Sequence, residues 1–303
     1  MTRPPKDIGA SVRARLLRLA RERGEDFQLL LTRYANERLL YRLSRSRHGA
    51  DFVLKGAALF ALWTGKPHRA TRDLDLLGFG DPGEGRVREV MSDVLALDVG
   101  DDGVRFDGHS LDVRPIREEQ EYGGVRAEVT ARVATARVRL RIDVGFGDVV
   151  TPEAPTVDFP PLLDFPAPRL RAYPRETVVA EKLEAMVRLG LANSRMKDFY
   201  DIVLLSRMFE FDSALLVRAI RATFERRGTP LPAALPSALT PAFAGDPAKA
   251  AQWGAFMRKS GGADLGDLSA VAAEIARFAQ RPLAAAAGAG PSPSRWPAGG
   301  PWS

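Results

Sequence analysis

One segment of the chain alternates between apolar and charged residues with the period of a β-strand. At residues 137–146, arginines and an aspartate separate the apolar side chains Val138, Leu140, Ile142 and Val144. Neighbouring side chains of a strand point to opposite faces of its sheet, so the segment predicts a half-buried strand with one polar face. Shorter period-two patterns predict further strands at 104–106, 111–116 and 125–133.

Helical patterns flank these strands on both sides. Apolar stripes with helical spacing occur at 12–24, 27–43, 86–97, 174–211, 248–257 and 265–278. Two short buried strands are expected between the second and third of these helices, at 52–54 and 71–77. Because strands and helices are grouped along the chain, we expect an α+β fold with a separate helical part.

These patterns divide the 303 residues into five parts. We expect a helical segment at 1–48, an α+β core at 49–150 and a C-terminal helical domain at 173–283. The proline-rich stretch 151–172 indicates a linker between the last two. The tail 284–303 is rich in alanine, glycine, proline and serine, and this composition indicates disorder.

Composition excludes several kinds of site and of location. The chain has no cysteine and three widely separated histidines, so any metal site must use oxygen ligands. It has no apolar run of about 18 residues and no apolar segment near its start, so we expect a cytoplasmic protein without a membrane span. The net charge of +6 favours a polyanionic partner, although an arginine-rich proteome would give the same excess.

Two aspartates two residues apart, Asp73 and Asp75, are the strongest candidates for a metal site. On the strand expected at 71–77 they share one face, roughly 6.5 to 7 Å apart, while Leu74 and Leu76 point into the core. Two carboxylates that close repel each other unless a cation lies between them, and Mg²⁺ prefers carboxylate and phosphate oxygens. An Asp-x-Asp pair also occurs at strand ends and in loops that bind no metal.

Asp143, on the polar face of the strand 137–146, is the candidate for a third metal ligand. With Asp73 and Asp75 it would complete a cradle for two ions, which could clamp the attacking and leaving oxygens of an in-line displacement. The alternative is a structural carboxylate at a strand end, paired with Arg139 or Arg141.

A glycine turn supplies the expected phosphate-binding end of the site. Gly56 separates the strand 52–54 from an apolar helix that begins near Ala57. Such a turn lets backbone amides and a helix N-terminus approach phosphates. The cations Lys55, Arg69 and Arg72 could neutralise the charge of a triphosphate.

The helical domain adds a lysine and two aspartates. The helical neighbours of Lys182 at three and four residues are apolar, so its ammonium group must reach beyond this stripe. It could reach water, pair with Glu184 or Asp201, or bind a nucleotide phosphate. Asp198 and Asp201 lie three residues apart on one side of a helix, where the helix dipole alone would also favour them.

Four motifs in this order resemble the AbiEii/AbiGii nucleotidyltransferase family, which includes the MenT-type toxins. They are Leu54-Lys-Gly-Ala-Ala-Leu59, Arg69-Ala-Thr-Arg-Asp-Leu-Asp-Leu76, Glu181-Lys-Leu183 and Arg195-Met-Lys-Asp-Phe-Tyr-Asp-Ile202. The resemblance covers roughly residues 52–205. It implies a bilobed protein with a polymerase-β-like nucleotidyltransferase core, a mixed sheet with helices, and a C-terminal helical domain.

The resemblance also implies an activity and a set of functional residues. It implies transfer of a nucleotide from an NTP, with Mg²⁺, to an RNA such as the tRNA 3′ end, which blocks translation, and inhibition by a cognate antitoxin. By motif, Asp73 and Asp75 would bind metal, Lys182 would bind phosphate and Asp198 would act in catalysis. Thr71 matches a hydroxyl position that antitoxins of some members phosphorylate.

One position departs from the family pattern, and two alternative functions stay open. Ala57 stands where glycine or serine is usual, and alanine restricts φ, so we expect a weaker nucleotide contact at this turn. The acceptor could instead be a protein or a small molecule. The chain could also be a non-catalytic nucleic-acid-binding or partner-binding protein with the same fold.

Overall fold

The computed structural model describes residues 7–116, 123–290 and 294–303. The chain forms two compact units, and each is described separately. The sheet unit comprises residues 1–147 and 155–172, and the helical unit comprises residues 148–154 and 173–303.

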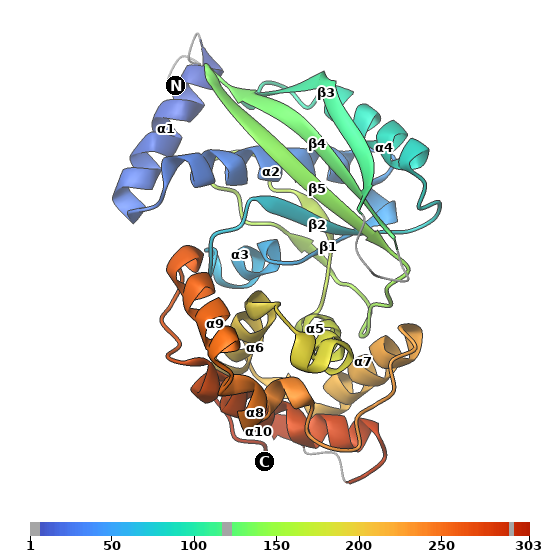
Figure 1. Ribbon diagram of the computed structural model, residues 1–303. Helices are drawn as coiled ribbons and strands as arrows, with labels where there is room; N and C mark the ends of the chain where they lie inside the picture. The colour runs from blue at the N-terminus through green and yellow to red at the C-terminus, as the bar shows by residue number, and fades with distance from the viewer. Residues whose placement is uncertain (1–6, 117–122, 291–293) are drawn as a thin grey trace. The chain divides into compact units, whose positions relative to one another are not determined.

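A mixed seven-stranded sheet forms the centre of the sheet unit (Figure 1). Its strands are β1 Phe52–Lys55, β2 Asp73–Gly78, β3 Val104–Ile116, β4 Gly124–Val133, β5 Ala136–Phe146, β6 Thr156–Asp158 and β7 Arg169–Ala172, in the spatial order β3-β4-β5-β2-β1-β7-β6. The pairs β2–β5 and β1–β7 are parallel, and the other neighbouring strands are antiparallel. This mixed sheet confirms the expected α+β fold.

Four α-helices belong to the described part of the sheet unit. They are α1 Ile8–Arg23, α2 Phe27–Arg45, α3 Ala58–Thr64 and α4 Glu84–Ala96. Asp7 and Asp26 cap the first two, each accepting a hydrogen bond from a backbone N–H of the first turn. Helix α2 passes behind β4 and β5 in Figure 1, where the apolar residues of β5 are buried as predicted. The charged residues of β5 therefore lie on the opposite face of the sheet.

The stretch 151–172, expected to be a linker, contains two strands of the sheet. β7 pairs in parallel with β1, and its residues Leu170 and Ala172 are buried. The prolines that suggested a linker lie outside β6 and β7, where no ladder hydrogen bond is needed from them. The two strands expected at 104–106 and 111–116 are one strand, β3, whose register shifts between Asp107 and Asp112.

Six α-helices form most of the helical unit as far as the structure describes it. They are α5 Arg175–Leu189, α6 Met196–Met208, α7 Ser213–Arg226, α8 Pro241–Ala244, α9 Pro247–Ser260 and α10 Leu268–Ala286. The single helix expected at 174–211 is two helices, because Gly190 takes a positive φ of 50° and ends α5. Helix α7 was not predicted. None of the helices in the described part of the chain has both the length and the apolar character that a membrane span needs.

The tail 284–303, expected to be disordered, is ordered wherever the structure describes it. Strand β9, Arg295–Trp296, pairs with β8, Phe211–Asp212, and the side chains of Trp296 and Trp302 are buried. Each indole N–H donates a hydrogen bond to a backbone carbonyl of the helical unit, at 2.7 Å. Burial of two tryptophans outweighs the local composition. Residues 291–293 of this tail lie outside the described residues.

Candidate functional site

The carboxylate pair lies at the start of β2, in the middle of the sheet. Leu74 and Leu76 are 2% and 1% exposed, whereas Asp73 and Asp75 are partly exposed. This alternation confirms that the two aspartates share the polar face of the sheet.

The glycine turn after β1 lies directly against Asp75. Gly56 has a φ of +74°, and a Cβ atom added to it would lie 2.0 Å from the Asp75 carboxylate oxygen Oδ2. A side chain at position 56 would therefore overlap the carboxylate as well as strain the backbone. Only glycine allows the chain to turn from β1 into α3 this close to the carboxylate pair.

The family departure at Ala57 carries no backbone strain. Ala57 has φ −68° and ψ −22°, which are ordinary helical angles, and its side chain is buried. The positive φ of this turn falls on Gly56 instead. The weaker contact expected from a restricted φ at position 57 is therefore not supported by its geometry.

Lys55 and Asp143 lie in register with Asp75 on the two neighbouring strands. Lys55 of β1 is the antiparallel partner of Asp75, and Asp143 of β5 is its parallel partner. The Lys55 Nζ atom lies 3.9 Å from where a Cβ of Gly145 would be, so the lysine side chain extends towards β5. The register thus brings one lysine and three aspartates to one end of the polar face.

Arg126 of β4 holds the Asp143 carboxylate in a two-pronged ion pair. Its Nε and Nη2 atoms donate to the two carboxylate oxygens at 2.7 Å each. The hydrogen bonds that Arg126 donates to Asp143 are the largest influence on the pKa of its guanidinium, and they raise it. The partner is thus neither Arg139 nor Arg141, the two that the sequence suggested. Whether Asp143 also binds a metal stays a prediction.

Arg141 of β5 joins Asp73 to a buried glutamate of β4. Its Nη1 donates to Asp73 Oδ1 at 3.4 Å, and its Nε donates to Glu128 Oε1 at 3.1 Å. Glu128 also accepts hydrogen bonds from Arg114 and Arg139. The polar face beside the carboxylate pair is therefore rich in arginine.

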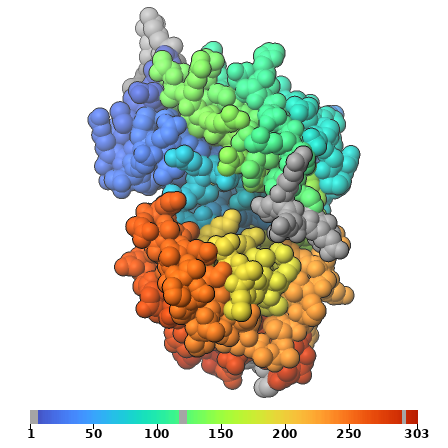
Figure 2. Space-filling view, in the orientation of Figure 1, coloured from blue at the N-terminus to red at the C-terminus, as the bar shows by residue number. Residues whose placement is uncertain are grey.

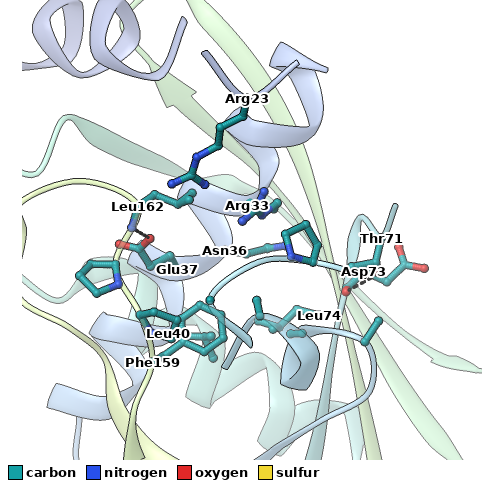
Figure 3. Close-up of a pocket in the computed structure, with 17 residues that line it drawn as sticks. Arg23, Arg33, Asn36, Glu37, Leu40, Thr71, Asp73, Leu74, Phe159 and Leu162 are labelled. Carbon is teal, nitrogen blue, oxygen red and sulfur yellow. Dashed lines mark hydrogen bonds between the residues drawn. The ribbon is translucent and has the colours of Figure 1, made fainter. Parts of the chain in front are cut away.

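A pocket of about 70 Å³ in the sheet unit reaches Asp73 from the side of α2 (Figure 3). Its walls come from α2, the start of α3, the loop before β2 and residues 159–162. Asn36 of α2 donates a hydrogen bond to the backbone oxygen of Arg72 at 3.3 Å and so ties this loop to the helix. Thr71 lines the pocket, and its hydroxyl donates to the backbone oxygen of Asp73 at 3.4 Å.

A buried glutamate of α2 forms part of the pocket wall. Glu37 accepts hydrogen bonds from the N–H of Leu162 and from the guanidinium of Arg38, both at 2.7 Å. Burial is the largest influence and raises the pKa of Glu37 to about 7, although Arg38 and the Leu162 N–H act in the opposite direction. This carboxyl group therefore changes charge near neutral pH.

The predicted cations of the loop before β2 have different surroundings. Arg72 is exposed, and Arg69 is partly exposed. Both belong to the sheet unit and precede Asp73 by four residues or fewer. Their proposed contact with a triphosphate stays a prediction.

The helical unit brings Lys182 of α5 together with Asp198 and Asp201 of α6. The Lys182 ammonium lies 2.7 Å from Asp198 Oδ1 and 2.9 Å from Asp201 Oδ2. Arg195, at the start of α6, donates to the second oxygen of Asp198 at 2.6 Å. Both aspartates and most of the Lys182 side chain are buried, whereas Arg195 is partly exposed. The suggested partner Glu184 pairs instead with Arg188 and Arg227.

Mutual attraction fixes the charges of this cluster. Burial is the largest influence on Lys182 and opposes its charge, but Asp198 and Asp201 outweigh it and raise the pKa of the ammonium. Burial likewise opposes the charge of Asp198, and Lys182 and Arg195 outweigh it and lower the pKa of the carboxyl group. Lys182 and Asp198 therefore form a charged pair at neutral pH.

The carboxylate pair fits a divalent cation that a nucleotide brings with it. Within the described ranges, no three histidine, aspartate or glutamate side chains converge on a point where a metal ion could sit. Mg²⁺ needs only one or two protein carboxylates when substrate phosphates supply further oxygens. Asp73 and Asp75, on one face and partly exposed, meet that requirement.

Two site residues escaped the sequence analysis: Arg126 and Glu37. Arg126 had a usable signal, because the short hairpin between β4 and β5 places it opposite Asp143. Arg195, which begins the fourth motif, pairs with Asp198 three residues later. Glu37 had no such signal, since its partner Leu162 is 125 residues away in the chain.

Comparisons with known proteins agree with this geometry. The family model of the AbiEii nucleotidyl transferase toxin, type IV toxin–antitoxin system, matches residues 38–275. Two Helicobacter pylori crystal structures resemble the fold. One, described as a candidate nucleotidyltransferase, has a TM-score of 0.52 and 15% identity, covering 86% of this chain and 97% of its own. The other, JHP933, has a TM-score of 0.50 and 16% identity, covering 86% and 94%.

A search of curated proteins gave no significant match. The two Helicobacter structures support the fold alone, since their identity to this chain is low. The family model spans more than three quarters of the chain, from α2 into α10, and includes both groups of site residues. The chain belongs to the AbiEii family of nucleotidyl transferase toxins of type IV toxin–antitoxin systems.

Proposed function

We propose that this toxin transfers a nucleoside monophosphate from an NTP, with Mg²⁺, to the 3′ end of an RNA, with tRNA as the expected acceptor. The observation that carries the proposal is the carboxylate pair Asp73 and Asp75 on the polar face, with the Gly56 turn against it. The family assignment supports nucleotidyl transfer. The positive charge of the chain favours an RNA acceptor.

Asp73 and Asp75 would hold the Mg²⁺, with Asp143 as a further candidate ligand. When bound, the ion supplies Lewis-acid stabilisation of charge on the phosphate oxygens. Arg126 and Arg141 hold the Asp143 and Asp73 carboxylates in place before any ligand arrives. This fixed arrangement reduces the reorganisation that the reaction requires.

The reaction forms a phosphodiester bond and breaks a phosphoanhydride bond. The RNA 3′ oxygen attacks the α-phosphorus of the NTP, the bond between the α-phosphorus and the bridging oxygen breaks, and pyrophosphate leaves. We assign the neutralisation of the triphosphate's negative charge to four cations, Lys55, Arg69, Arg72 and Lys182. Gly56 and Ala57 allow the backbone to approach it.

Asp198 is better suited to positioning than to proton transfer. Its low pKa makes it a weak base, and both of its oxygens already bind cations. We therefore assign Asp198, with Asp201, to orienting Lys182 towards the nucleotide. The proton of the 3′ hydroxyl would pass to solvent or to another group.

Labelled nucleotides test the acceptor. The purified toxin is incubated with each α-³²P-labelled NTP in turn, with total RNA or total protein, and the products are separated by size and by nuclease treatment. We expect nuclease-sensitive label on RNA of tRNA length. Label on protein would favour the alternative acceptor. If no product is labelled and the toxin does not bind any NTP with Mg²⁺, a non-catalytic binding protein would be favoured.

The family also implies a cognate antitoxin. We propose that it inhibits the toxin at the residues around Thr71, which precedes the carboxylate pair and lines the α2 pocket. Mass spectrometry of the toxin after coexpression with the antitoxin would show whether Thr71 is modified. An unmodified, inhibited toxin would rule out that mode of inhibition.

A further inference from the structure

Three arginines form a row across the polar face of the sheet, and no carboxylate of the described residues pairs with them. Arg105 of β3 lies opposite Arg132 of β4, and Arg132 lies opposite Arg137 of β5. All three residues are exposed. We call them the arginine row; in the part of the chain that the structure describes, none of the three forms an ion pair.

Other arginines on the same face are paired. Arg126 binds Asp143, while Arg114, Arg139 and Arg141 share the single carboxylate of Glu128. Ion pairing is therefore the usual arrangement of arginines on this face. The arginine row differs, because its three guanidinium groups have no ion-pair partner among the described residues.

Directly opposite residues on neighbouring strands have Cβ atoms about 4.5 to 5.5 Å apart, and like charges at this distance destabilise a sheet. The row contains two such contacts, Arg105 with Arg132 and Arg132 with Arg137. A polyanion laid across the row would convert this repulsion into attraction. Guanidinium groups are particularly suited to phosphates, which they bind through two parallel hydrogen bonds.

The row continues towards the carboxylate pair along β5. Arg137, Arg139 and Arg141 project from one face of this strand, and Arg141 is the register partner of Asp73. From Arg137 to Arg141 is about 13 Å along the strand. These arginines are ion-paired, because Arg114, Arg139 and Arg141 share Glu128, Arg114 also contacts Asp112 and Arg141 also contacts Asp73. Guanidinium groups therefore continue from the row to the pair, but only the row has no paired carboxylate among the described residues.

The helices that cover the sheet leave this face open. Helix α2 lies behind β4 and β5 in Figure 1, and the strands β3 to β5 face the viewer. In the space-filling view, atoms of these strands form the green surface of the sheet unit (Figure 2). An elongated ligand could thus contact the row and β5 together.

We propose that the arginine row binds the phosphodiester backbone of the RNA acceptor, upstream of the 3′ end that reacts at Asp73 and Asp75. The inference rests on the proposed function, because it assumes that an RNA is the acceptor. Phosphate contacts fix the position of a nucleic acid without reading its sequence. The row would therefore set acceptor affinity rather than choice of nucleotide.

The test is the full-length variant R105Q/R132Q/R137Q, assayed with unfractionated tRNA. We expect the dissociation constant measured by fluorescence anisotropy in 100 mM KCl to rise at least tenfold. The slope of log Kd against log [KCl] should fall by about 2, as for the loss of three phosphate contacts with a single strand. The KM for tRNA should rise while kcat and the KM for the NTP stay unchanged.

A second triple variant controls for charge. R218Q/R258Q/R277Q removes three exposed arginines of α7, α9 and α10 and changes the net charge equally. It should bind tRNA nearly as the wild type does. Because glutamine removes the repulsion within the row, the first variant should unfold at a urea concentration no lower than that of the wild type.

Equal tRNA affinities of the two triple variants would overturn the inference. So would a row variant that keeps its tRNA affinity and loses only its inhibition by the antitoxin, because the row would then be a protein-docking surface. These outcomes are separate from failure of the proposed function. That failure would appear in the wild type itself, as an absence of label on RNA.

Discussion

At the scale of single residues, the position of the Asp75 carboxylate determines which side chain can stand at position 56. The carboxylate fills the space that a side chain at position 56 would need, and the positive φ at that position excludes most other residues. The turn and the aspartate therefore have to be considered as one structural feature. A change at the glycine should act on the carboxylate.

We predict that Gly56→Ala reduces nucleotidyl transfer at least a hundredfold. The new methyl group would displace the Asp75 carboxylate from its position in β2. Gly100→Ala is the matched control, because Gly100 has a similar φ of +80° and no atom within 4 Å of the added Cβ. Steady-state transfer rates are measured for both variants. Gly56→Ala combines backbone strain with the collision against Asp75, whereas Gly100→Ala has backbone strain alone. Equal losses of transfer rate in the two variants would show that the collision has no effect.

Lys182 is expected to support the stability of the helical unit as well as the reaction. Replacing it with methionine leaves Asp198 and Asp201 buried with one cation fewer, and breaking a buried ion pair on one side costs about 3 kcal/mol. Lys197→Met is the control, because Lys197 is exposed on α6 one residue before Asp198. Urea unfolding gives the loss in free energy of unfolding for each variant. A loss for Lys182→Met no larger than that for Lys197→Met would contradict the prediction.

The pH dependence of stability follows from the low pKa of Asp198. A carboxyl group with a lowered folded-state pKa stabilises the fold above its unfolded pKa of 3.8, and this contribution is lost as pH falls through the folded value. We therefore expect the stability advantage of the wild type over Asp198→Asn to be constant near neutral pH and to shrink below pH 3.8. Urea unfolding at pH 7, 5 and 3 measures the difference in free energy of unfolding between the two proteins. A difference that grows as the pH falls would contradict the prediction.

At the scale of elements, the β4–β5 hairpin sets the register of the site. Val133 pairs with Ala136 across a two-residue turn, and this register places Arg126 opposite Asp143. Ala134 in the turn has a positive φ of 50°. Short hairpin turns favour glycine, asparagine or aspartate at such angles.

We predict that Ala134→Gly stabilises the protein by about 0.5–1 kcal/mol, since it relieves the left-handed conformation of alanine. Ala136→Gly, at the start of β5, should instead destabilise it by a similar amount, because glycine weakens a strand. Thermal unfolding of the two variants compares them. A destabilised A134G would show that the turn is not strained.

Short-range patterns predicted the elements that carry the site, and long-range pairing determined the rest. Alternation correctly placed Asp73 and Asp75 on the polar face, and helical spacing correctly placed Asp198 beside Asp201. The strand β7 was missed because its burial depends on pairing with β1, more than a hundred residues earlier. The ordered tail was missed because Trp296 and Trp302 are stabilised by packing against distant residues such as Phe278, which outweighs local composition.

At the scale of the whole molecule, the chain contains two separate groups of charged residues. The sheet unit has the carboxylate pair, and the helical unit has the Lys182 cluster. The family model covers both. We propose that both contribute to one reaction, so single changes in either unit should lower the same rate.

The most direct test of the central claim is label transfer by Asp73→Asn and Asp75→Asn. Each variant is incubated with the preferred α-³²P-labelled NTP, Mg²⁺ and tRNA, beside the control Asp158→Asn, whose side chain is on the exposed strand β6. We predict transfer at least a thousandfold lower than that of the control, with circular dichroism and unfolding midpoints unchanged. Wild-type transfer by either variant would show that the carboxylate pair is not the reaction centre.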